Sequence, residues 1–506
     1  MSTQTTDHPV DKKRSNKASL DKDLKKFTKL ESATRSLSRR MIAPGLSLAF
    51  LALSALLAGV ELGHGASGTI LAIAAVLAGY MALNIGANDV ANNVGPAVGA
   101  RALTMTGALI IAAIFEAAGA LIAGGDVVKT ISKGIIDPAQ LGNSTIFINA
   151  MMAALVASAV WVNLATFIGA PVSTTHAVVG GVIGAGLAAA GFSAVNWPVM
   201  GGIAASWVIS PAMGGIIAAA FLWVIKDRIV YQRDKIAAAR LWVPLLLAVM
   251  SAAFAAYLAL KGFAQIWKPS KLTVALGALA TFAVSFALLR PLIRRQSEGL
   301  ENRNQSLRKL FNLPLICSAA LLSFAHGAND VANAVGPLAG ILHAAESGAV
   351  AGKVHLPVWI MVIGAVGISL GLFLFGPRLI RTVGEQITRM NPMRAFCVAL
   401  SAAITVLVAS ALGLPVSSTH IAVGAVFGVG FFREQYIARS TRRRAYLVHK
   451  GRLSENSLLP DAQEMVRRKL VRRSHFTVII AAWIITVPAA GAIAAAIYML
   501  LSRIAA

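Results

Sequence analysis

Charged residues are scarce in this chain. Asp, Glu, Lys and Arg make up 13% of its 506 residues, against 57% for hydrophobic residues. A soluble domain carries about 25% charged and about 45–50% apolar residues. The composition therefore excludes a soluble enzyme, a disordered chain and a fibrous protein. Thirteen membrane spans of about 20 residues would need about 260 residues, and that much apolar sequence is available.

Cysteine is nearly absent. Cys317 and Cys397 both lie in apolar runs, which argues against a disulfide framework and against a cysteine-based metal site. The sequence also lacks a nucleophile elbow, a Walker loop, the spacing of zinc ligands and a general acid–base pair. We therefore expect neither enzymatic activity nor a fixed metal cofactor.

Acidic residues are the scarcer of the two charge types. Lys and Arg number 46 against 21 for Asp and Glu, a formal net charge of +25. In a membrane protein this excess indicates cytoplasmic loops that face anionic lipid, so no nucleic-acid partner is expected. The basic residues cluster in the connections 226–240, 290–309 and 433–473. If the basic tail 1–40 is cytoplasmic, the first six spans return the chain to the cytoplasm at 226–240. Two more spans return it there at 290–309, and four more at 433–473.

The apolar segments predict an all-α, polytopic membrane protein with about 12–13 transmembrane helices. They cover 42–61, 68–87, 103–124, 146–168, 172–190, 198–225, 241–261, 271–292, 312–335, 356–376, 394–412, 415–432 and 476–501. We divide the chain into a basic cytoplasmic tail (1–40), an extra transmembrane helix (41–67), a first repeat (68–225), linking helices with basic loops (226–310), a second repeat (311–432), a basic cytoplasmic loop (433–475) and a final transmembrane helix (476–506).

Two motifs occur twice and in the same order. Residues 86–96 recur at 327–337 with ten matches in eleven positions, and residues 169–176 recur at 413–420. The offsets are 241 and 244 residues. Chance does not produce such agreement, so the chain contains two diverged copies of one unit.

The span count gives these copies a direction. The loop between the two motifs, about 125–144, falls outside in the first copy, whereas its counterpart, about 378–394, falls inside and is rich in arginine. The copies are therefore expected to have inverted topology. Inverted repeats with interrupted helices at matching positions are typical of secondary transporters that bind substrate near the membrane midplane.

The first motif places carboxylates and amides inside apolar sequence. A carboxylate in the bilayer costs several kcal/mol unless it is paired or binds a cation. Gly86, Gly95 and Pro96 can interrupt the helix and free backbone carbonyls. Such oxygen ligands suit a hard cation such as Na⁺, and the aspartates could instead carry protons. The candidate coupling-cation residues are Asn88, Asp89, Asn92, Asn329, Asp330 and Asn333; Asn93 is less certain because Ala334 replaces it in the second copy.

The second motif indicates an anion site. Pro171 and Pro415 suit the start of a helix, where free backbone N–H groups and the helix dipole favour negative charge. The hydroxyl residues that follow are Ser173, Thr174, Thr175, Ser417, Ser418 and Thr419, and we expect them to bind the substrate anion. The alternative is that these hydroxyls only cap the helices.

Four further polar residues lie in or near the motifs. His176 and His420 end the second motif in both copies, and they either orient a hydroxyl, sense protons or belong to the core. Glu116 is a lone carboxylate within the span 103–124 and serves either coupling or helix pairing. His326 is ranked lower because Ile85 stands at its position in the first copy.

The paired GANDVAN and PVS(T/S)TH motifs resemble those of the inorganic phosphate transporter (PiT) family, and the resemblance covers about 80–480. The segment from Phe115 to Asp137 is also similar to that family. The resemblance implies uptake of inorganic phosphate coupled to Na⁺ or H⁺, with both ligands bound between two inverted halves. It also implies that the phosphate could travel as a metal–phosphate complex. We expect a multi-pass protein of the plasma membrane, the bacterial inner membrane, surrounded by lipid.

From these residues we expect a symporter that works by alternating access, with cations binding first and completing the anion pocket. Sulfate is an alternative anion, although it cannot donate a hydrogen bond to the aspartates as phosphate can. A channel or a phosphate sensor is the alternative from another functional class. The coupling ion, its stoichiometry and the choice between monomer and homo-oligomer stay open.

Overall fold

A computed structural model describes residues 41–61, 66–136, 138–141, 143–168, 172–262, 268–347, 356–383, 390–449, 451 and 473–505. Contacts divide the chain into two units, Met1–Ala49 and Phe50–Ala506. Of the first unit, only residues 41–49 are described, and they begin a helix that ends at Glu61. The basic tail 1–40, residues 169–171 and 384–389, and most of the basic loop (452–472) lie outside the described residues.

The second unit is built from helices in two sets that follow the repeat. The first set is α2 (Ala66–Asn88), α3 (Ala91–Gly99), α4 (Met105–Ala123), α5 (Gly125–Lys129), α6 (Ser144–Ile168), α7 (Thr174–Ala190) and α8 (Trp197–Ile225). Three helices link the sets: α9 (Lys235–Tyr257), α10 (Lys271–Gln296) and α11 (Asn304–Leu310). The second set is α12 (Asn312–Ser347), α13 (Val358–Thr382), α14 (Pro392–Ala411), α15 (Ser418–Arg439), α16 (Thr441–His449) and α18 (Arg473–Ala505).

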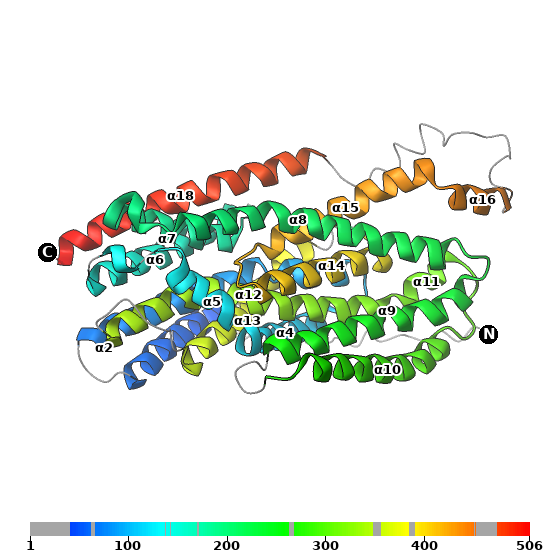
Figure 1. Ribbon diagram of the computed structural model, residues 1–506, viewed down its shortest axis with the longest axis horizontal. Coiled ribbons are helices and arrows are strands. Elements are labelled where there is room, and N and C mark those ends of the chain that lie inside the picture. The colour runs from blue at the N-terminus through cyan, green and yellow to red at the C-terminus, as the bar shows by residue number, and fades with distance from the viewer. Residues whose placement is uncertain are drawn as a thin grey trace, which may run out of the picture. The chain divides into compact units, whose positions relative to one another are not determined.

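The number of membrane-spanning helices agrees with the sequence. Among the described residues, 12 helices are long and apolar enough to cross a bilayer. The remaining predicted segment, 415–432, forms α15, which is helical but is not among those 12. The prediction of an all-α polytopic protein with about 12–13 spans is therefore confirmed. Figure 1 shows these helices, with α8 and α18 among the longest.

Helices of one copy pack on helices of the other. The most extensively packed pairs that join the two copies are α2 with α13, α4 with α12, α7 with α18 and α8 with α15. The first two pairs pack in the same register: Gly119 of α4 lies against Phe324 of α12, and Gly371 of α13 lies against Leu83 of α2. This crossed arrangement is consistent with two inverted copies that share one core.

Glycine makes these contacts possible. A Cβ atom added to Gly86 would overlap the backbone carbonyl of Ile368, and one added to Gly327 would overlap that of Glu116. Membrane helices approach this closely where small residues replace bulky ones, because lipid gives no hydrophobic force to press them together. The backbones near the first motif are therefore in direct contact with the opposite copy.

Two features differ from the sequence-based expectations. The helix is interrupted in the first copy only, where a turn at Asp89 and Val90 separates α2 from α3, whereas α12 runs through Asn329 and Asp330 without a break. The segment 125–144 is also not a plain external loop. It forms α5 and a π-helical turn (Thr130–Gly134) whose Ile131 contacts Gly336 of α12.

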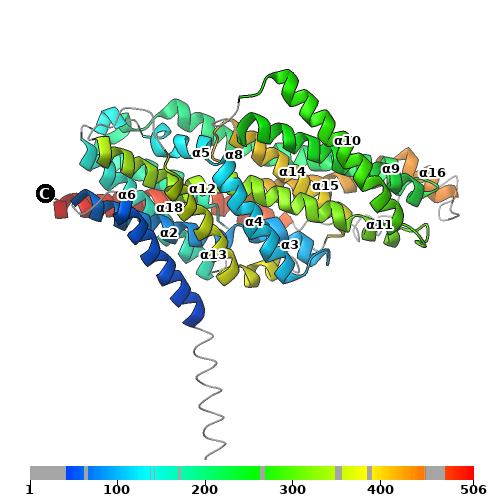
Figure 2. The same ribbon diagram turned by 90° about the horizontal axis from the view of Figure 1, so that it is seen from below.

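The described parts of the three basic connections lie at one end of the second unit, on the right in Figure 1. Hydrogen bonds join them: Asn302 accepts from the backbone N–H of Lys235, and Lys235 donates to Tyr446. Their common position is what the span count requires. Figure 2 shows α10 at the edge of the unit, beside α9. Most of the apolar side chains of α10 are exposed.

The crossed packing predicts an unequal response to glycine replacement. Gly371→Ala should destabilise the protein by about 1–3 kcal/mol, because the new Cβ overlaps the Leu83 carbonyl in a packed interface. Gly202→Ala in α8 is the matched control, since nothing lies within 4 Å of its Cβ position and alanine favours the helix. Thermal unfolding of the purified protein in detergent measures both; equal melting temperatures would contradict the packing.

Candidate functional site

The four copies of the two motifs meet in the core of the second unit. Each asparagine that begins the first motif bonds to a hydroxyl residue in the helix that precedes the second motif. Asn88 donates to Thr166 at 2.6 Å, and Asn329 donates to Ser410 at 2.9 Å. Thr166 and Ser410 are 244 residues apart, the same offset as the second motif itself. The two bonds are therefore symmetric counterparts.

The aspartates follow the same rule. Thr174 donates to Asp89 Oδ2 at 2.6 Å, and Ser418 donates to Asp330 Oδ2 at 3.4 Å. In each copy a hydroxyl at the start of the second-motif helix thus contacts the carboxylate of the first motif. The first motif, predicted to bind the cation, and the second motif, predicted to bind the anion, are therefore in direct contact rather than at two separate sites.

A third pair of bonds crosses between the copies. Asn92 of the first copy donates to Thr419 of the second at 2.9 Å, and Asn333 of the second donates to Thr175 of the first at 3.0 Å. Neither half can therefore form the complete hydrogen-bond network alone. The structure brings together all six predicted cation residues and the four Thr and Ser residues at the two helix starts.

The carboxylates are buried and incompletely bonded. Asp89 is 2% exposed and Asp330 is 1% exposed. Atoms of Asp89, His326 and Asp330 that could bind a metal lie within 4.8 Å of one another. Among the described residues, no hydrogen bond reaches Asp89 Oδ1, Asp330 Oδ1 or Asn333 Oδ1. Buried oxygens without donors are costly, and carboxylate and amide oxygens are the ligands that hard cations prefer.

The second-motif helices begin at this cluster. The hydroxyls of Ser173 and Ser417 accept from the backbone N–H groups of His176 and His420, so these two serines are N-caps. The capping role that was the alternative for these hydroxyls is therefore present at both serines, and anion binding by them stays a prediction. In the described hydrogen bonds, the backbone N–H groups of Thr174 and Thr175, and of Ser418 and Thr419, have no acceptor. Two helix starts thus offer N–H groups to an anion.

His176 and His420 contact each other. Their ring centroids are 4.5 Å apart in an edge-on arrangement, and the His176 ring lies 3.9 Å from that of Trp207. Counterpart residues of two copies touch only near the axis that relates the copies. The histidines therefore mark the centre of the pseudo-symmetric core, beside the hydroxyl residues that precede them.

One part of the network has no counterpart. Glu116 accepts from Asn93 at 2.8 Å, and its other oxygen lies 2.7 Å from His326 Nδ1. The other ring nitrogen, His326 Nε2, lies 2.7 Å from Asp330 Oδ2. Gly119 and Gly371 make equivalent packing contacts, so the position equivalent to Glu116 in the second copy is Ile368. The position equivalent to His326 in the first copy is Ile85.

This asymmetric group corrects the ranking from sequence. His326 was ranked low because it occurs once, yet its imidazole joins Glu116 to Asp330 at the centre of the site. Thr166 and Ser410 were not singled out, although both lie one turn or so before a motif and share its offset. Thr130 also reaches the site, since it donates to the carbonyl of Gly413 at 2.7 Å.

The asymmetric pair predicts non-additive effects on stability. His326→Ile should cost about 3–5 kcal/mol, because it removes the imidazole that contacts the buried carboxylates of Glu116 and Asp330. Glu116→Ile/His326→Ile should recover at least half of the lost melting temperature, since Ile85 and Ile368 occupy the corresponding positions of the other copy. Thermal unfolding of the two single variants and the double variant gives the coupling. A double variant that loses the sum of the single effects would contradict the pairing.

Comparison with known proteins identifies the family of this chain. Residues 85–494 match the phosphate transporter family. A Helicobacter pylori protein named "Putative phosphate permease" is 45% identical over 95% of this chain and 99% of its own length. A similarly named protein of Thermococcus kodakarensis is 38% identical over 71% of this chain and 88% of its own length. A solved structure titled "The sodium-dependent phosphate transporter" has a TM-score of 0.76 and 35% identity, and covers 86% of this chain and 100% of its own. The chain, a multi-pass membrane protein, therefore belongs to the phosphate transporter family.

Proposed function

We propose that this protein imports inorganic phosphate together with Na⁺ by alternating access, through the site that the two copies share. The observation that carries the proposal is the set of three matched hydrogen-bond pairs, which surrounds two buried carboxylates with helix starts from both halves. Transport proteins with inverted repeats use such a shared site, because rocking one half against the other exposes it to each side in turn.

The charges at the site require a cation before the phosphate. Asp89 and Asp330 repel an anion, and no Lys or Arg side chain belongs to the described cluster. Na⁺ at the free oxygens of Asp89, Asp330 and Asn333 would supply the missing positive charge. Phosphate would then bind at the N–H groups of Thr174, Thr175, Ser418 and Thr419, with their hydroxyls re-oriented from the carboxylates to the anion.

Na⁺ is preferred to H⁺ on two grounds. The solved relative is titled a sodium-dependent transporter. Asp89, Asp330 and Asn333 also each leave a buried oxygen without a hydrogen bond, and protonation of a single aspartate would leave the other oxygens without a partner. The plasma membrane, with the basic end of the second unit in the cytoplasm, is the expected location.

Phosphate is preferred to sulfate because of the acceptors at the site. A phosphate that retains a proton at neutral pH can donate a hydrogen bond to Asp89 or Asp330, and sulfate cannot. A site that leaves a buried acceptor unpaired rejects the ligand that lacks the donor. A channel and a phosphate sensor are distinguished by accumulation: only a coupled transporter concentrates phosphate.

The coupling ion is tested in liposomes that contain the purified full-length protein. An inward Na⁺ gradient should drive accumulation of labelled phosphate, and a pH gradient without Na⁺ should not. Excess unlabelled phosphate should compete and excess sulfate should not. Accumulation under the pH gradient alone would overturn Na⁺ coupling, and uptake that only equilibrates phosphate would overturn coupled transport.

The carboxylates are tested by Asp89→Asn and Asp330→Asn in the same assay. Each replacement keeps the size of the side chain but removes a charge, so each should reduce Na⁺-driven uptake at least about 100-fold, which corresponds to about 2.7 kcal/mol. Glu61→Gln is the matched control, because Glu61 is an exposed carboxylate far along the chain from both motifs, and it should keep the normal rate. Normal uptake by either aspartate variant would remove that residue from the site.

A further inference from the structure

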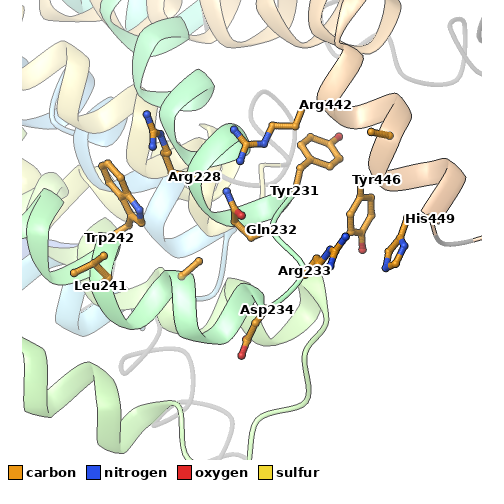
Figure 3. Close-up of a pocket in the computed structure, with 12 residues that line it drawn as sticks. Arg228, Tyr231, Gln232, Arg233, Asp234, Leu241, Trp242, Arg442, Tyr446 and His449 are labelled. Atoms are coloured by element: carbon orange, nitrogen blue, oxygen red, sulfur yellow. The ribbon is translucent and has the colours of Figure 1, made fainter.

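A polar cavity lies at the basic end of the second unit, away from the repeat motifs. It has a volume of about 680 Å³ and is formed by the turn between α8 and α9 together with α16. Figure 3 shows Arg228 and Trp242 on one side, Tyr446 and His449 on the other, and Arg442 and Gln232 between them. No residue of this cavity takes part in the hydrogen-bond network of the motifs.

The cavity carries an excess of positive charge. Asp227 lies 2.7 Å from Arg442 Nη1 and 3.4 Å from Arg228 Nε, so one carboxylate serves two guanidinium groups. Among the described residues no carboxylate lies within ion-pair distance of Arg233. Asp234 also lines the cavity, but its carboxylate caps α9 by accepting from two backbone N–H groups. Guanidinium groups bind phosphate oxygens in pairs of parallel hydrogen bonds.

A buried ammonium group stands behind the same wall. Lys235 is 3% exposed, and its Nζ donates to Tyr446 Oη at 2.9 Å and to the carbonyl of Gln232 at 3.2 Å. It has no carboxylate partner among the residues that the structure describes. An ammonium has three donors, and a buried charge is costly unless a counter-charge compensates it. An anion in the cavity would supply that counter-charge.

An apolar groove begins where the cavity ends. Trp242 lines both, and Arg228 lies over its ring at 5.4 Å from the centroid. The groove has a volume of about 520 Å³ and runs along α9 between α8 and α14. Its walls are almost wholly apolar, with Phe221, Leu246 and Met250 among them. A basic cavity that continues into an apolar groove at the end of membrane helices matches a molecule with an anionic head and an apolar tail.

We propose that this cavity and groove bind one anionic phospholipid. The headgroup phosphate lies between Arg233 and Arg442, with Lys235 behind it, and an acyl chain passes Trp242 into the groove. Arg442 and Tyr446 belong to α16, the first part of the long basic loop, so the lipid also holds this helix against the turn before α9. The site thereby gives the basic loop a position at the cytoplasmic membrane surface.

Native mass spectrometry of the full-length protein in non-ionic detergent tests the headgroup. Dioleoyl phosphatidylglycerol and dioleoyl phosphatidylcholine carry the same chains, so their difference reports the charge of the head. Phosphatidylglycerol should bind tighter, and Arg233→Gln/Arg442→Gln should weaken its binding at least about ten-fold, which corresponds to about 1.4 kcal/mol, because charge-assisted hydrogen bonds to the phosphate are lost. Lys271→Gln/Arg503→Gln removes two exposed charges elsewhere and should leave the affinity unchanged.

Two further measurements test the binding of the acyl chain and distinguish a lipid phosphate from free inorganic phosphate. Ala253→Phe places a ring in the groove and should also weaken phosphatidylglycerol, whereas Ala280→Phe on the exposed face of α10 should not. Arg233→Gln alone covers the case in which the double variant fails to fold, and it should still weaken phosphatidylglycerol. Equal affinity for both lipids, equal loss in the pocket and control variants, or full displacement by excess inorganic phosphate would overturn the proposal.

Discussion

The burial of two carboxylates around one imidazole is the constraint on which the rest of the core depends. A charge inside a bilayer is costly unless neighbouring groups compensate it. Asp89 and Asp330 each accept a bond from a hydroxyl donor, and His326 contacts Asp330. The hydroxyl donors come from helices that are distant in sequence from the aspartates, so the backbones must approach closely, and the glycines at the crossings allow this. The electrostatic requirement thus explains the packing.

The core is symmetric in its hydrogen bonds and asymmetric in its charges. Asn92 and Asn333 donate equivalent hydrogen bonds from one half to the other. Glu116 and His326, in contrast, are replaced by Ile368 and Ile85 at the equivalent positions of the other copy. Only the first copy contains a helix break at its aspartate. The two carboxylates therefore lie in different surroundings, and a cation bound by both is held unequally. A transporter that alternates between two conformations has a use for such a difference, because equivalent halves would give no preferred order of binding.

Much of the fold followed from the sequence because it depends on pattern. The segments from 42–61 to 476–501 predicted the helices, and the repeated motifs, with their constant offsets, predicted that Asp89 and Asp330 belong to one system. The continuity of α12 could not be predicted, because its motif matches the first copy in ten of eleven positions and the difference arises from packing. His326 was ranked low because comparison between repeats favours residues that recur.

Other features of the structure also depend on contacts that the sequence pattern does not reveal. Ser173 and Ser417 are hydroxyl residues at helix starts, and nothing in their spacing distinguishes a cap from a ligand. The segment from Gly125 to Gly134 contains charged residues that indicate a loop, but its buried Val and Ile residues pack on α12. The cavity around Arg233 forms because α16 lies beside the turn before α9, and no local sequence pattern predicts that contact.

The stoichiometry of phosphate binding tests the central claim most directly. Equilibrium dialysis of labelled phosphate against purified protein in saturating NaCl should give one phosphate per chain. Asn92→Ala in the first copy and Asn333→Ala in the second should each weaken that single site, because both halves form it. Two phosphates per chain, with one retained at full affinity in each variant, would show that the halves bind separately and would contradict a shared site.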